Sequence, residues 1–160
     1  FVFIDDPAQS QIRISFKQSG SWSVVGNTAL QVAKNKPTMN FGWLTPNSSD
    51  EQVRSVVLHE FGHALGLIHE HQNPGGVIPW NKPQIYRDLA GPPQNWDKAK
   101  VDRNLFAVYD RDLTNFTDVD QKSIMMYPIA ENWVTQPGFA RDLNTDLSDV
   151  DRGFIREQYK

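Results

Sequence analysis

Apolar and polar residues alternate in two short stretches of the first half of the chain, Ile12–Phe16 and Thr38–Leu44. Alternation with a period of two is typical of half-buried β-strands, and in the second stretch it places Met39, Phe41 and Trp43 on one side. The neighbouring segments predict a further short apolar strand and a loop, which are Phe1–Ile4 and Gly20–Gly26.

A helical period replaces the alternation after residue 50. The segment before it, Pro46–Glu51, has the composition of a helix start, and Ser48 with Glu51 three residues later fits a capping box. Gly66 ends the pattern, because a glycine at this position permits the left-handed backbone that terminates many helices. The apolar positions that define the helix are Val53, Val56, Val57, Phe61, Ala64 and Leu65.

The second half of the chain carries a weaker pattern. From Gln72 to Lys122 it is rich in Pro, Trp, Asn and Asp and predicts mostly irregular structure. One short helix is expected at Asp97–Phe106, with Val101 and Leu105 pointing inward. The large aromatic residues are expected to fill the core, because they bury a large apolar area; they are Trp80, Tyr86, Trp96 and Trp133.

The end of the chain predicts a second clear helix, capped by Ser148 with Asp151 at its third position. Its apolar face is formed by Leu147, Val150, Phe154, Ile155 and Tyr159. The pattern as a whole indicates an α+β fold, in which a small twisted sheet and one long helix precede an irregular half closed by a C-terminal helix. A length of 160 residues fits a single domain.

The composition narrows the possible functions. The net charge of −3 gives no electrostatic reason to expect binding to nucleic acid or to an anionic membrane. No apolar run approaches the ~20 residues that cross a bilayer. The chain has no cysteine, which excludes disulfides and thiolate metal sites and leaves histidine as the natural nitrogen ligand. Two N-x-S/T sequons, at Asn47 and Asn115, permit glycosylation in a secretory pathway.

All four histidines lie between residues 59 and 71, in the pattern H-E-x-x-H-x-x-G-x-x-H. His59 and His63 are four residues apart, so on a helix their imidazoles share one face and can reach one metal ion. A turn at Gly66 can bring His69 back as a third ligand. Three imidazoles leave a fourth position for water, as in catalytic zinc sites. We therefore expect one Zn²⁺ per chain.

Glu60 directly follows the first expected ligand, where its carboxylate can take a proton from water and deliver it to the leaving amine. As an ordinary surface charge it would be poorly placed, since a carboxylate late in a helix opposes the helix dipole. His71 is a competing ligand two residues past His69, but the glycine-to-histidine spacing favours His69. We interpret Glu60 as the general base and His71 as non-ligating.

A second motif, Ser123-Ile124-Met125-Met126-Tyr127-Pro128, lies far downstream. On its own it predicts only an apolar strand or turn. Beside the zinc motif it resembles the Met-turn of the metzincin peptidases, S-x-M-x-Y. The resemblance implies that Met125 forms a hydrophobic floor under the metal. It also implies that Tyr127 is a fifth zinc ligand at rest, which swings away to hydrogen-bond the tetrahedral intermediate.

Within the metzincins, Glu70 after the third histidine resembles the astacin pattern, whereas serralysins carry proline there. The similarity to bacterial and fungal astacin-type domains covers most of the chain, including Gly20–Gly26 and Leu147–Asp151. The chain departs from animal astacins in having no cysteine and in having Met126 where they usually have histidine. We expect one metallopeptidase catalytic domain, residues 1–160, that lacks the family's first strand and first helix.

In metzincins the substrate lies extended and antiparallel to an edge strand above the metal. Backbone hydrogen bonds hold any extended peptide there, and side-chain pockets select among peptides. The alternative is an ordinary sheet edge with no part in binding. The resemblance assigns the substrate strand to Thr38, Met39, Asn40, Phe41, Gly42 and Trp43.

These features predict a secreted, monomeric zinc endopeptidase that acts on protein or peptide substrates and has neither nucleic acid nor a membrane as a partner. One alternative is a zinc-containing binding module that does not cleave. The presence of both Glu60 and Tyr127 argues against it, because a purely structural metal site needs neither. Another alternative is a matrixin- or serralysin-like protease of the same clan, for which dependence on structural calcium would discriminate.

Overall fold

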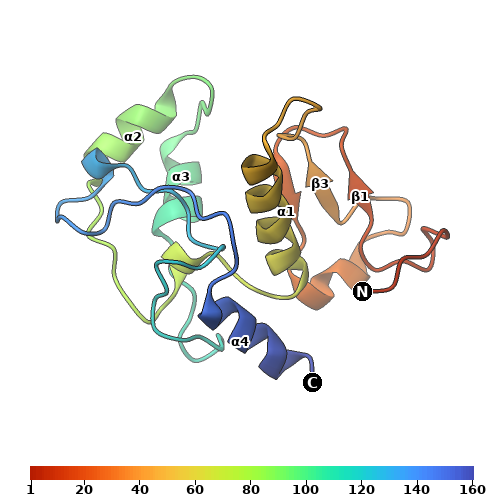
Figure 1. The fold of residues 1–160 in the computed structure, drawn as a ribbon. Coiled ribbons are helices and arrows are strands. Elements are labelled where there is room, and N and C mark those ends of the chain that lie inside the picture. Colours follow the sequence, from red (N-terminus) through yellow and green to blue (C-terminus); the bar gives the residue numbers. More distant parts are fainter. The chain divides into compact units, whose positions relative to one another are not determined.

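Strand β3 (Met39–Phe41) is the centre of a small mixed sheet in the computed structural model, which describes all residues 1–160 (Figure 1). Strand β1 (Ile14–Ser15) pairs with it in parallel, and Ile14 lies opposite Met39. Strand β2 (Ser21–Ser23) pairs with its other side in antiparallel fashion, and Trp22 lies opposite Asn40. The sheet order is β1-β3-β2, so both edges of β3 are already hydrogen-bonded.

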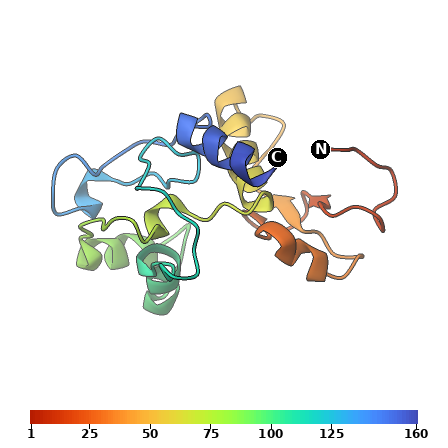
Figure 2. The same cartoon turned by 90° about the horizontal axis from the view of Figure 1, so that it is seen from below.

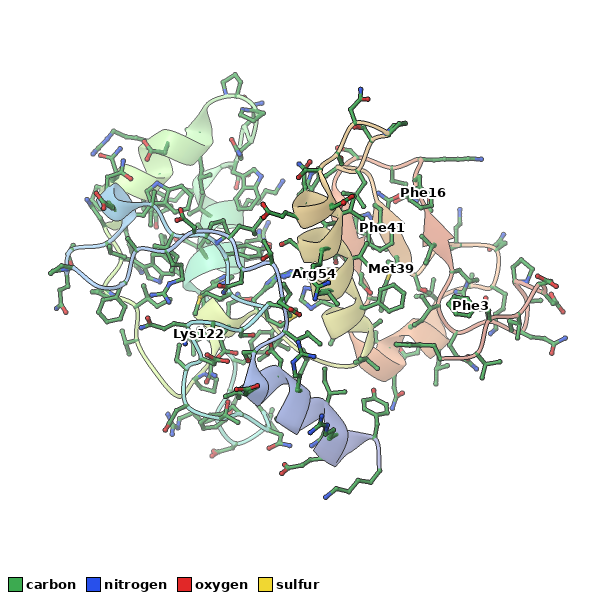
Figure 3. The ribbon with its side chains drawn as sticks, in the orientation of Figure 1. Phe3, Phe16, Met39, Phe41, Arg54 and Lys122 are labelled. Carbon is green, nitrogen blue, oxygen red and sulfur yellow. The ribbon has the colours of Figure 1, made fainter.

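The central position of β3 follows from its residues, which are all buried. Met39 and Phe41 lie between the sheet and the long helix α1, as Figure 3 shows. The side chain of Asn40 is fully buried and satisfies its amide on the turn between β1 and β2. It donates to the carbonyls of Gln18 and Gly20 and accepts from the Gln18 N–H. Asn40 thus fixes this turn against the centre of the sheet.

Four expectations for this region were wrong in detail. The predicted loop Gly20–Gly26 contains strand β2 and the start of the 3₁₀ helix η1 (Gly26–Gln31). Phe1–Ile4 forms no strand and is exposed, and Trp43 is exposed because the chain turns directly after Phe41. The predicted substrate strand, Thr38 to Trp43, is not an edge, because β1 and β2 occupy both of its sides.

Helix α1 (Asp50–Ala64) starts one residue later than predicted. The cap is Ser49, whose hydroxyl accepts from the Gln52 N–H, while the Ser48 hydroxyl accepts from the Thr45 N–H in the preceding turn. The helix ends as predicted at Gly66, which has φ +95°. Gly66 N–H donates to the His63 carbonyl and Leu67 N–H to the Gly62 carbonyl, which together form a Schellman motif.

Helix α4 (Asp149–Gln158) begins with the predicted capping box between Ser148 and Asp151. It belongs with residues 1–68 in one compact unit, which comprises residues 1–68 and 145–160. In Figures 1 and 2 it lies beside the C-terminal part of α1. The Tyr159 hydroxyl donates to the carbonyl of Leu65, the C-cap residue of α1. Asp146, just before α4, forms an ion pair of 2.7 Å with Arg54 of α1.

The second unit comprises residues 69–144. It contains the expected short helix, present as α3 (Lys98–Val101) followed by the π-helical segment η3 (Asp102–Phe106). It also contains helix α2 (Lys82–Ala90), which falls within the stretch predicted to be irregular. Two single 3₁₀ turns complete the unit, η2 (Glu70–Gln72) and η4 (Glu131–Trp133).

The core of this unit forms where α2 meets α3 and η3. Val101 and Leu105 are buried as predicted, and they pack with Ile85 and Leu89 of α2. The four predicted core aromatics pack around this cluster as half-buried residues, together with others; they are Trp80, Tyr86, Trp96 and Trp133. None of the helices in the chain has the length and apolar character needed to span a membrane.

Candidate metal centre

Helix α1 presents His59 and His63 one turn apart, with ring centroids 4.9 Å from each other. The Schellman motif that follows reverses the chain, and His69 comes five residues after the helix ends. One ligand nitrogen from each of His59, His63 and His69 lies within 4.8 Å of the other two. The structure therefore brings together the three histidines that the spacing predicted, and it leaves His71 outside the group.

The ring of His63 is held in the orientation and tautomer that metal binding requires. Its Nδ1 donates to the Leu67 carbonyl at 2.9 Å, which leaves Nε2 as the unprotonated nitrogen. Burial is the main cause that lowers the pKa of His63 to about 4, with a contribution from His59. At neutral pH the imidazole is therefore uncharged, as a metal ligand must be.

His69 has a corresponding support in Gln72, which is buried. The His69 Nδ1 lies 3.4 Å from Gln72 Oε1, and the Gln72 amide donates to the Arg103 carbonyl at 3.1 Å. The carbonyl fixes the amide with its oxygen toward His69, because only the nitrogen side of the amide can donate. A hydrogen bond of this kind to a ligating imidazole orients the ring and makes it more basic.

Glu60 is 3% exposed, and its Oε2 is buried without a hydrogen-bond partner. Burial alone raises the pKa of its carboxyl to about 7. A buried carboxylate is costly unless it is paired with a positive charge. A divalent cation held by the histidines on either side along the chain would supply that charge, and three neutral imidazoles suit zinc better than calcium or magnesium. The residues present thus fit a zinc ion.

The Met-turn region is buried and hydrogen-bonded to the segment that carries the third histidine. Met125 and Ser123 are each 1% exposed. The Ser123 hydroxyl accepts from the Met125 N–H at 3.0 Å, and the Met125 carbonyl accepts from the N–H of Glu70 at 3.0 Å. Glu70 in turn accepts from the Asn73 side chain and from the Asp120 N–H. These bonds fix the residue next to His69 on the turn that contains Met125.

Tyr127 lies beside His69, with ring centroids 4.4 Å apart and planes inclined by 54°. Its ring also lies 4.6 Å from that of His71, which is buried. The structure therefore brings the ring of Tyr127 into contact with His69, a histidine of the metal group.

The sequence model of the Astacin family of peptidases matches residues 1–132. The chain belongs to the astacin family. Two solved structures of myroilysin are also similar to it. One is 46% identical with a TM-score of 0.88, and the match covers 93% of this chain and 72% of that chain. The other, a crystal structure, is 44% identical with a TM-score of 0.63, and the match covers 93% of this chain and 65% of that chain. No curated protein sequence matches significantly.

Membership in the astacin family makes the chain a zinc metalloendopeptidase, a hydrolase that acts on peptide bonds. One zinc ion per chain is the cofactor of astacin peptidases, and His59, His63 and His69 form the corresponding triad here. The family also confirms the expected α+β metzincin fold. A binding module that does not cleave and a protease of the matrixin or serralysin type are not favoured.

Several contributors to this astacin site were absent from the sequence prediction. The Leu67 carbonyl that orients His63 is a backbone group, so no side-chain motif can mark it. Gln72 is polar in a polar segment, and only its burial distinguishes it. Strand β2, which was predicted to be part of a loop, could have been found from the sequence, because Ser21-Trp22-Ser23-Val24 alternates polar and apolar residues.

Proposed function

We propose that this astacin-family chain acts as a single catalytic domain that cleaves extended polypeptides outside the cell. In this proposal His59, His63 and His69 hold the zinc ion, Glu60 moves the proton and Tyr127 stabilises the negative charge that develops on the scissile carbonyl. The observation that carries it is the unpaired, buried Oε2 of Glu60, in a chain whose three ligand nitrogens gather within 4.8 Å.

When bound, zinc supplies the Lewis acidity that activates water and polarises a peptide carbonyl. Glu60 provides the proton acceptor that peptide hydrolysis needs. Without a neighbouring positive charge, burial raises the pKa of the Glu60 carboxyl to about 7. A neighbouring divalent cation favours the charged form and so keeps Glu60 ready to accept. The proton then passes from Glu60 to the leaving amine.

Tyr127 is proposed as the hydrogen-bond donor to the developing oxyanion. A phenol donates from a single hydroxyl, and one such donor contributes about 3–4 kcal/mol of transition-state stabilisation. Support comes from its place beside His69, with ring centroids 4.4 Å apart. By the family resemblance Tyr127 would also help to hold the zinc ion in the resting enzyme. Met125, buried in the Met-turn, supports the site by packing alone.

The substrate is proposed to add as a strand to β2, because the predicted strand, β3, has no open edge. Two edges remain, and β2 is favoured over β1 because β2 packs against α1, which carries two of the histidines, while β1 does not. Strand addition needs backbone N–H groups on the substrate. A peptide substrate N-methylated at alternate residues should therefore bind more weakly, with a raised KM. An unchanged KM for both methylation registers would exclude strand addition.

The decisive experiment replaces Glu60 by alanine. Glu60→Ala should retain about one zinc ion per chain and lose nearly all cleavage of casein, because the change removes the proton acceptor and leaves the three ligands in place. Glu51→Ala, at the exposed start of the same helix, is the matched control and should cleave casein as the wild type does. Casein cleavage by zinc-loaded Glu60→Ala at a rate near that of the wild type would refute the assigned role.

Secretion and a monomeric state complete the proposal. Astacin-family proteases are commonly secreted, and a net charge of −3 favours neither nucleic acid nor an anionic membrane as a partner. Light scattering on the purified protein tests the oligomeric state, and a mass near that of a dimer would contradict a monomer. Appearance of the protein in the culture medium of its source tests secretion.

A further inference from the structure

His71 is a buried histidine that the ligand group does not include. It is 5% exposed, and its Nε2 lies 2.8 Å from the Asn104 carbonyl. A carbonyl oxygen only accepts, so Nε2 carries the proton and donates. The ring is therefore fixed at one end by a backbone group of η3.

The face of the His71 ring also packs against other aromatic rings. It stacks on His69, with centroids 5.2 Å apart and planes inclined by 23°, and lies against Tyr127 at 4.6 Å and 32°. Trp80 meets the His71 ring edge-on at 6.4 Å. Tyr127 consequently has two imidazoles against it, that of His69 and that of His71. The imidazole of His71 is anchored to the backbone of a separate element, at the Asn104 carbonyl of η3.

The anchor exists because of how η3 ends. A helix leaves its last carbonyls without intrahelical partners, and the Arg103 and Asn104 carbonyls lie near the end of η3. Two consecutive side chains of η2 satisfy them: Gln72 donates to Arg103, and His71 donates to Asn104. The Tyr109 N–H also donates to the Gln72 carbonyl, which ties η2 to the chain after η3. The loop between His69 and Asn73 is thus held by side-chain and backbone bonds together.

We propose that His71 is a positioning residue for Tyr127: it restricts the orientation of the phenol ring, and with it the place of the hydroxyl, by packing against that ring from a backbone anchor on η3. This inference rests on the proposed role of Tyr127 as oxyanion donor. The anchored imidazole restricts the phenol to one arrangement before substrate arrives, so less order has to be gained in the transition state.

If His71 only filled space in the core, there would be no reason for it to be a histidine. An apolar ring would fill the same space without the cost of desolvating two ring nitrogens. The hydrogen bond to the Asn104 carbonyl fixes the His71 ring, and the fixed ring limits the orientations open to Tyr127, whose ring centroid lies 4.6 Å away. The residue that benefits is the one with a rotatable polar end, Tyr127.

The test uses His71→Phe, which keeps a flat ring and removes the donor, in the zinc-loaded full chain. We expect kcat to fall about tenfold, as for a small misplacement of a catalytic group, with KM unchanged within a factor of two. Tyr86→Phe is the matched control. It removes the hydrogen bond from Tyr86 to Asp102, the first residue of η3, and leaves the bond between His71 and the Asn104 carbonyl in place. Its kcat should equal that of the wild type.

A double-mutant cycle separates positioning from general damage. In a Tyr127→Phe background there is no hydroxyl left to position, so adding His71→Phe should lower kcat no further. An equal fall of kcat in both backgrounds would overturn the inference, as would an unchanged kcat for His71→Phe. If Tyr127→Phe alone leaves kcat unchanged, the proposed role of Tyr127 fails and this inference fails with it; the first two results overturn the inference alone.

Further measurements are needed for two cases. In one, His71→Phe fails to fold; in the other, His71 acts on the metal ligand His69 and not on Tyr127. His71→Gln keeps a donor for the Asn104 carbonyl and removes the ring, and it should show the same loss in kcat. In the zinc-free wild type, NMR of labelled tyrosine rings should show slow flipping for the Tyr127 ring, which becomes fast in His71→Gln. If the variant binds zinc more weakly but has an unchanged kcat at saturating zinc, then His71 supports the zinc ligand His69 and not Tyr127. That result would overturn the inference.

Discussion

Tyr127 makes the sharpest prediction for a single residue, because it can be changed by one atom. Tyr127→Phe removes the hydroxyl and keeps the ring that packs beside His69. Turnover should fall roughly a hundredfold, which corresponds to about 3 kcal/mol, with KM little changed, since the bond exists only in the transition state. Steady-state kinetics of the zinc-loaded variant measures this. An unaltered kcat would mean that Tyr127 is a packing residue only.

At the scale of single residues, the positions of the metal-binding motif could be predicted from the sequence, but the groups that orient its side chains could not. His59, Glu60 and His63 could be placed because helical geometry alone sets their spacing. His69 could be placed because Gly66 marks the turn before it. The partners that orient the imidazoles could not be predicted, since the Leu67 carbonyl is backbone and the hydrogen bond of Gln72 to Arg103 joins residues far apart in the chain.

At the scale of secondary-structure elements, the role of Gly66 in ending helix α1 can be tested directly. Gly66→Ala places a side chain at φ +95°, where no neighbour would clash with it, so the cost is backbone strain alone. We expect the free energy of unfolding to fall by about 1–2 kcal/mol. Gly153→Ala, in the middle of α4 and equally free of neighbours, is the control and should raise it by about 1 kcal/mol. Urea denaturation measures both, and equal effects would contradict a conformational role for Gly66.

Capped helices were predictable and the remaining elements were not. The capping box of Ser148 was predicted at the right residues, and α1 was misplaced by a single residue because both Ser48 and Ser49 can cap. Helix α2 was missed although Pro83 stands in its first turn, since its apolar face is short. The sheet order was out of reach, because it depends on pairings between strands distant in sequence, such as Ile14 with Met39.

For the whole molecule, the bound ion should determine both activity and stability. The purified protein should contain about one zinc ion per chain, and chelation should abolish cleavage and lower the unfolding temperature. Ligand binding to the native state alone adds roughly 4 kcal/mol at a thousandfold excess over its dissociation constant. Returning zinc should restore both properties. Elemental analysis that finds no transition metal in the native protein would refute this.

The Schellman turn after α1 also has a consequence for how the chain comes together. It confines the three metal ligands to residues 59–69, so the loops that separate them are short. The entropy lost in closing a loop grows with its length, and here it is small. The ligands can therefore meet while distant pairings, such as that of β1 with β3, are still unformed. Zinc can thus bind this short segment early in folding, and the rest of the fold can assemble around it.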